Sequence, residues 1–159
     1  MVGFIHAYEN EQNLVVIRDQ LILTIKRGYQ GYPTNLRPKM WELVCRCKSA
    51  AFKKGSFEKL SKMKVSEQEN LQILQDLQQL KSEVGRFIYM CTDEGQQRIF
   101  LILKWVLVYD PKLKYEMPLM KLVAFVVENM ETSTDQDIFF AMIHIMKILG
   151  WKEIYNDEN

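Results

Sequence analysis

Apolar residues recur at intervals of three or four along most of this 159-residue chain, which is the spacing of amphipathic helices. The segment 67–91 is the longest example. Its expected inner positions are Ile73, Leu77, Leu80, Val84 and Phe87, and its expected outer positions are Gln72, Gln75 and Gln79. Ser66 and Glu69 form the capping-box pattern that precedes such a helix. We therefore predict a long helix over 67–91.

Further helices are predicted where the same spacing is bounded by capping residues, glycine or proline. These segments are 14–27, 38–54, a short stretch after Ser56, 92–109, 118–130 and 135–150. Thr92 and either Ser133 or Thr134 are the expected caps, and Gly55 and Gly150 the expected stops. The segment 14–27 is also rich in β-branched residues, so a strand is the alternative there.

The segment between Ile99 and Tyr109 is apolar nearly all round, which predicts a helix enclosed by its neighbours. The pattern therefore favours an all-α fold, a compact bundle of six or seven helices around a central apolar helix at about 95–109. A chain of this length is close to the commonest domain size, so we expect a single helical domain over 1–159. The polar residues 155–159 are expected to be flexible.

Composition indicates a soluble protein of the cytoplasm or nucleus. The chain has three cysteines, an odd number that argues against a disulfide framework. Its first residues lack the basic and apolar regions of a signal peptide. The most apolar run, 99–109, is too short to span a bilayer and contains Lys104.

Charge is distributed unevenly, although the net charge is only +1. Residues 37–64 hold nine basic and two acidic side chains, whereas residues 65–159 hold nine basic and fifteen acidic ones. Within the expected helix 38–54, Lys39, Arg46 and Lys53 share a face with Glu42, as on any solvated helix side. The basic excess there is explained without a ligand.

A second stripe of the same helix mixes aromatic and basic residues, since Lys48 lies between Trp41 and Phe52. Such a surface suits a nucleic acid, through phosphate contacts and base stacking, or an acidic membrane. The candidate polyanion-binding residues are Arg37, Lys39, Arg46, Lys48, Lys53, Lys54, Lys59, Lys62 and Lys64.

A protein interface is predicted on the segment 135–150, where aromatic residues and a cation follow helical spacing, as in many hot spots. The candidate interface residues are Trp41, Phe52, Phe140, His144, Lys147 and Trp151. The alternative is that Phe140 and Trp151 close the core.

Catalytic chemistry has little support in the sequence. Cys45 and Cys47 would point about 200° apart on a helix, so they cannot grip one metal ion. No phosphate-binding loop, nucleophile elbow or metalloprotease motif occurs. A pair between His144 and a cysteine would depend on tertiary structure. We expect no catalytic residues, no metal and no cofactor, and hence no enzyme.

These observations favour a non-catalytic helical adaptor or accessory protein that binds a protein partner, with self-association as a further option. The alternative is a protein that binds nucleic acid or acidic membrane through residues 37–64. The sequence implies no small-molecule substrate.

Overall fold

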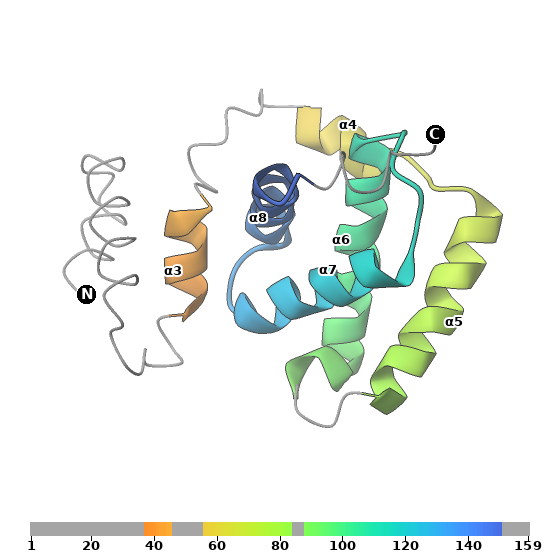
Figure 1. Cartoon of the computed structure of the whole chain (residues 1–159), viewed down its shortest axis with the longest axis horizontal. Coiled ribbons are helices and arrows are strands. Elements are labelled where there is room, and N and C mark those ends of the chain that lie inside the picture. Colours follow the sequence, from red (N-terminus) through yellow and green to blue (C-terminus); the bar gives the residue numbers. More distant parts are fainter. Residues whose placement is uncertain (1–36, 46–55, 84–87, 151–159) are drawn as a thin grey trace.

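The computed structural model describes residues 37–45, 56–83 and 88–150. Within these residues it contains α-helices and one 3-10 helix and no β-strand, so the predicted all-α fold is confirmed (Figure 1). The elements are α3 (Arg37–Val44), α4 (Ser56–Lys62), α5 (Glu67–Glu83), η3 (Tyr89–Cys91), α6 (Asp93–Tyr109), α7 (Met117–Asn129) and α8 (Asp135–Ile148). No helix in this part of the chain is both long and apolar enough to cross a membrane.

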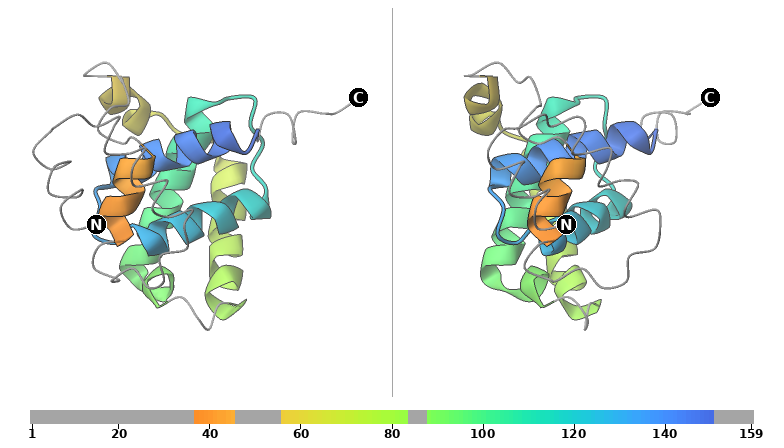
Figure 2. Two further views of the ribbon diagram at one scale, coloured as in Figure 1. Left: turned by 60° about the vertical axis from the view of Figure 1, so that its left-hand side comes forward. Right: turned by 90° about the vertical axis from the view of Figure 1, so that its left-hand side faces the viewer.

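Helix α6 runs through the middle of the domain, with α4, α5, η3, α7 and α8 packed against it (Figures 1 and 2). Ile99, Ile102, Leu103 and Val106 on this helix have no exposed surface. Their burial follows from the sequence, because a helix that is apolar nearly all round is stable only when neighbours cover it. The prediction of a central apolar helix is therefore confirmed.

The capping residues act largely as their sequence positions suggest. Glu69 N donates to Ser66 Oγ at 3.2 Å, and Ser66 N donates to Glu69 Oε2 at 3.3 Å, so the capping box of α5 is formed. The hydroxyl of Thr92 caps α6, and that of Thr134 caps α8. Gly150 follows α8 with φ 61°, a left-handed conformation that glycine adopts without strain.

The long helix predicted over 67–91 needs correction at its end, because Tyr89–Cys91 form a separate 3-10 helix. This turn is held by α7, since the backbone N–H of Met90 donates to Glu128 Oε2 at 2.7 Å. It lies so close to α6 that a Cβ on Gly95 would be 2.2 Å from Tyr89 O. At Tyr89–Cys91, hydrogen bonds to Glu128 of α7 therefore stabilise a 3-10 turn in place of the predicted α-helix.

Several predicted features lie outside the described residues. They are the helix over 14–27, residues 46–54 of the helix over 38–54, the stop at Gly55, the inner positions Val84 and Phe87, and the flexible end 155–159. The inner positions Ile73, Leu77 and Leu80 of α5 are buried as predicted.

Tyr115, in the connection between α6 and α7, attaches α5 to the rest of the domain. Its hydroxyl donates to Asp76 Oδ2 at 2.6 Å, and the residue is only 8% exposed. Burial, together with the hydrogen bond to Asp76 and the negative charge of that carboxylate, raises the pKa of Tyr115 well above that of a free tyrosine. The folded protein therefore strongly favours the neutral phenol.

We predict that Tyr115→Phe makes the free energy of unfolding less sensitive to alkaline pH. In the unfolded chain Tyr115 ionises near pH 10, whereas in the folded protein its pKa is higher. Its stabilising contribution is therefore complete below pH 10 and is lost as pH rises above that value. The lost hydrogen bond should itself cost about 1 kcal/mol at neutral pH.

Urea unfolding between neutral and alkaline pH measures both effects. Tyr109→Phe, at an exposed tyrosine, is the matched control. If parent and Tyr115→Phe lose stability in parallel above pH 10, the proposed linkage is wrong.

Candidate functional site

A depression of about 500 Å³ lies where the start of α6 meets the connection between α7 and α8. Its lining residues are Glu94, Gln97, Arg98, Leu101, Glu131, Ser133, Thr134 and Asp135. Several of these side chains are polar, and Glu94, Glu131 and Asp135 are acidic.

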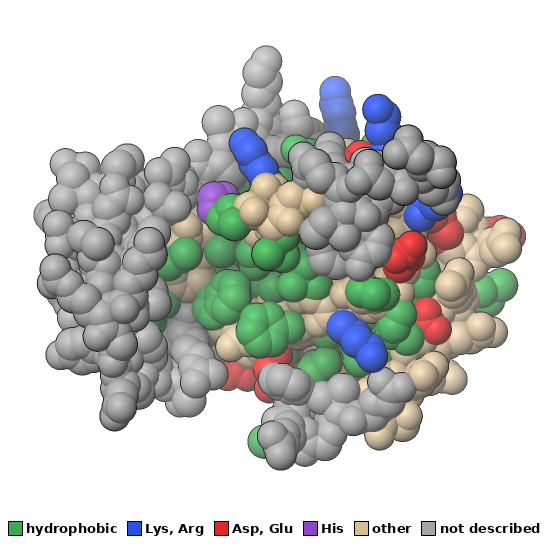
Figure 3. Space-filling view, viewed as in Figure 1, with side chains coloured by type: hydrophobic (Ala, Val, Ile, Leu, Met, Phe, Trp, Pro, Cys, Tyr) green, Lys and Arg blue, Asp and Glu red, His purple; other side chains and the backbone are tan. Residues whose placement is uncertain are grey.

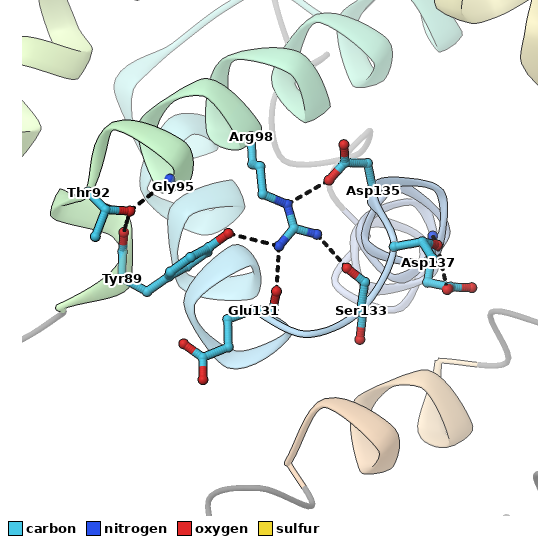
Figure 4. Close-up of polar contacts among 9 residues, drawn as sticks. Tyr89, Thr92, Gly95, Arg98, Glu131, Ser133, Asp135 and Asp137 are labelled. Carbon is cyan, nitrogen blue, oxygen red and sulfur yellow. Dashed lines mark hydrogen bonds and ion pairs between the residues drawn. The ribbon is translucent and has the colours of Figure 1, made fainter.

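Arg98 of α6 extends across this depression toward the loop that precedes α8 (Figure 4). Its Nε donates to Asp135 Oδ1 at 2.6 Å. One Nη donates to the hydroxyl of Tyr89 at 3.0 Å and to the carbonyl of Glu131 at 2.6 Å. The other Nη donates to the carbonyl of Ser133. These contacts use four of the five N–H groups of the guanidinium.

The Arg98 network fixes the guanidinium as a permanent cation. Burial opposes the charge, yet the hydrogen bonds with Tyr89 and Asp135 and the charge of Asp135 raise the pKa of Arg98 above its ordinary value. Burial raises the pKa of Tyr89 as well. Only 11% of the Arg98 side chain is exposed. Arg98 therefore joins η3, α6 and the start of α8, and it is not free to reach a bound molecule.

The network continues from Ser133 to α3. Ser133 Oγ donates to Glu42 Oε1 at 2.7 Å, and both residues are buried. The other oxygen of Glu42 forms an ion pair with Lys39 Nζ at 3.4 Å. Glu42 was expected on a solvated helix face, so that expectation was wrong. A buried carboxylate is stable here because a hydroxyl and a cation satisfy its oxygens.

The predicted polyanion-binding residues do not form one described surface. Lys39 pairs with Glu42 on α3, whereas Lys59 and Lys62 on α4 and the following Lys64 are exposed. The side chains of Arg37, Arg46, Lys48, Lys53 and Lys54 lie outside the described part of the chain. Lys and Arg side chains project from the upper edge of the molecule in Figure 3.

The predicted interface residues are also separated. Phe140 is only 7% exposed and lies 5.4 Å from Phe139 between ring centroids, so it is a core residue and cannot be an exposed anchor. Trp41 is half-buried, and the centroid of its ring lies 5.8 Å from that of Phe125. Lys147 is exposed. His144 is half-buried, and its Nε2 is enclosed. Phe52 and Trp151 lie outside the described residues.

The sequence prediction missed the Arg98 network. Its one local signal was a basic residue directly before the apolar run that begins at Ile99. The acceptors lie 33 to 37 residues further along the chain, or on the side chain of Tyr89, so spacing along the sequence could not identify them.

We predict that Arg98→Lys destabilises the domain by about 3 kcal/mol. A lysine cannot reproduce the fork of four hydrogen bonds, and the carbonyl of the buried residue Ser133 would lose its donor. Tyr89→Phe removes a single one of these bonds and should cost about 1 kcal/mol. Urea unfolding measures both changes. A loss below about 0.5 kcal/mol for Arg98→Lys, the range of ordinary surface substitutions, would contradict the structural role.

Comparison with known proteins identifies the class to which this helical domain belongs. No curated protein and no solved structure matches the chain significantly. Residues 34–159, which include all the described helices, match the family described as the Rab-GTPase-TBC domain. The match gives no support to nucleic-acid binding.

Two expectations change with this match. Domains of this kind stimulate GTP hydrolysis by Rab GTPases, so the expectation that the chain is not an enzyme was wrong. The expectation of a protein partner was right in its coarse form, and the class of partner is a Rab GTPase. Because the match covers most of its length, the chain belongs to the Rab-GTPase-TBC domain family.

Proposed function

We propose that this chain binds a Rab GTPase loaded with GTP and accelerates hydrolysis of the nucleotide. The family match over residues 34–159 carries this proposal, because it includes the whole helical core from α3 to α8. In such a reaction the nucleotide, the metal and the attacking water belong to the GTPase. The activator has to supply only positioning and charge, so it needs no phosphate-binding loop, nucleophile elbow or metalloprotease motif of its own.

Of these two contributions, a positive charge close to the transferred phosphoryl group is the more specific requirement. A GTPase-activating protein commonly supplies an arginine that stabilises the negative charge developing on the transferred phosphoryl group. Arg98 is unsuited to this task, because its guanidinium is held by Asp135, Tyr89 and two backbone carbonyls. The other arginines within the matched segment are Arg37, Arg46 and Arg86. We propose that one of these three contributes to hydrolysis.

Two of the predicted interface residues fit this function as contacts with the GTPase. Trp41 is half-buried on α3 beside the exposed ring of Phe125, and Lys147 is exposed on α8. Aromatic residues with part of their surface available are frequent anchors of protein interfaces. They are proposed as binding residues and not as participants in hydrolysis.

Single-turnover hydrolysis by a panel of purified, GTP-loaded Rab GTPases tests the proposal. We expect the chain to accelerate hydrolysis by at least one member. Among Arg37→Ala, Arg46→Ala and Arg86→Ala, one should reduce the acceleration by about 10³-fold or more, the usual value of an activating arginine. Lys81→Ala, at an exposed lysine on α5, is the control.

The outcomes separate the parts of the proposal. If no Rab GTPase is accelerated, the proposed activity is wrong. If acceleration survives in all three arginine variants, the activity stands and the arginine mechanism is wrong. Circular dichroism of each variant shows whether a loss reflects unfolding.

A further inference from the structure

The end of the domain at which α4 packs on α6 is rich in exposed lysines. Lys59 and Lys62 lie on α4, Lys64 follows it, and Lys112 follows α6. None of the four forms an ion pair with another described residue. In Figures 1 and 2, α4 and the end of α6 both lie at the top of the molecule. We call these four residues the lysine end.

Helix α4 is oriented so that its basic side faces away from the core. The ring of Phe57 packs on Trp105 with centroids 4.8 Å apart and also contacts Phe139, while Leu60 is buried. These apolar contacts hold the helix on α6 and α8. Lys59 and Lys62 are consequently displayed on the outer surface without needing any partner within the fold.

The opposite end of α6 is acidic, so the two ends of the domain differ in charge. Five acidic residues lie around the start of α6 and α8, namely Asp93, Glu94, Glu131, Asp135 and Asp137. They outnumber the two cations that pair with them, Arg98 with Asp135 and Lys81 with Asp93. Trp105, on which α4 packs, is twelve residues after Asp93, or about 18 Å along the helix axis. An extended anionic surface would therefore attract the lysine end and repel the acidic end.

An exposed apolar side chain accompanies the lysines. Met63 lies between Lys62 and Lys64 and is 57% exposed. By contrast, the ring of Phe57 faces the core, and the partly exposed ring of Tyr109 packs edge-on against Phe139 with centroids 5.8 Å apart. Lysines around an apolar residue suit the interface of a membrane with acidic lipids, where charge attracts and an apolar group inserts. Single-stranded nucleic acid would favour exposed aromatic platforms instead.

We propose that the lysine end docks this domain on a membrane surface that contains anionic phospholipids. Lys59, Lys62, Lys64 and Lys112 contact the headgroups, and Met63 enters the boundary between headgroups and acyl chains. The acidic end then points away from the lipid toward the solution. This proposal is independent of the proposed GTPase-activating function, because it concerns a different set of residues.

Vesicle co-sedimentation of the full chain tests the proposal, with phosphatidylcholine vesicles and with vesicles that also contain phosphatidylserine. We expect binding that requires phosphatidylserine and weakens as salt rises. Lys59→Ala with Lys62→Ala should lower the affinity roughly 25-fold, or roughly fivefold for each lysine. The matched control is Lys81→Ala with Lys121→Ala, which removes the same charge from α5 and α7 and should change binding much less.

Met63→Ser separates insertion from charge, because it leaves the charge unchanged. It should weaken vesicle binding by up to roughly tenfold. The proposal is wrong if the parent chain shows no dependence on phosphatidylserine, or if the two double variants lose affinity equally. It is also wrong if single-stranded RNA binds more tightly than the vesicles and competes for the same lysines.

Lipid-free GTP hydrolysis should be unchanged in Lys59→Ala with Lys62→Ala. Failure of the membrane proposal therefore leaves the proposed GTPase-activating function untouched.

Discussion

Burial of most of α6 is the constraint on which the rest of the domain depends. Part of the surface stays exposed along one stripe of the helix and at its last residue, namely at Gln97, Leu101, Lys104, Val108 and Tyr109. Ile99, Ile102, Leu103 and Val106 have no exposed surface, and each fully buried aliphatic side chain contributes about 1.5–3 kcal/mol relative to an exposed one. No single neighbour can cover such a helix. Helices α4, α5, α7 and α8 all dock on it, and together they cover most of its surface.

Polar contacts then fix how these helices are placed. Arg98 holds the loop before α8, Ser133 on that loop binds Glu42 of α3, and Tyr115 binds Asp76 of α5. Each contact satisfies a buried or half-buried polar group, so each favours one arrangement of the apolar helices over alternatives. The polar depression beside Arg98 is thus lined in part by residues of this hydrogen-bond network. Its chemistry is structural, which agrees with a domain whose reacting atoms would be supplied by a partner GTPase.

Local features of the fold were predictable from the sequence, and contacts between distant residues were not. The capping box at Ser66 locates α5, and the cap at Thr92 and the apolar run through Ile99 locate α6, because each feature depends on neighbours within one or two turns. The 3-10 helix at Tyr89 depends on Glu128 of α7, which spacing cannot reveal. The enzymatic function was not predicted for a related reason. A GTPase activator needs a positioned side chain at an interface with its partner, and residue spacing within this chain alone did not single one out.

Native-state hydrogen exchange tests the central role of α6 most directly. If burial of this helix holds the domain together, amides between Ile99 and Leu107 should exchange only through global unfolding, with the highest protection among the described helices. The short helix α4 should exchange through local opening at lower free energy. Exchange of the α6 amides before those of α5 would show that the domain does not depend on its central helix.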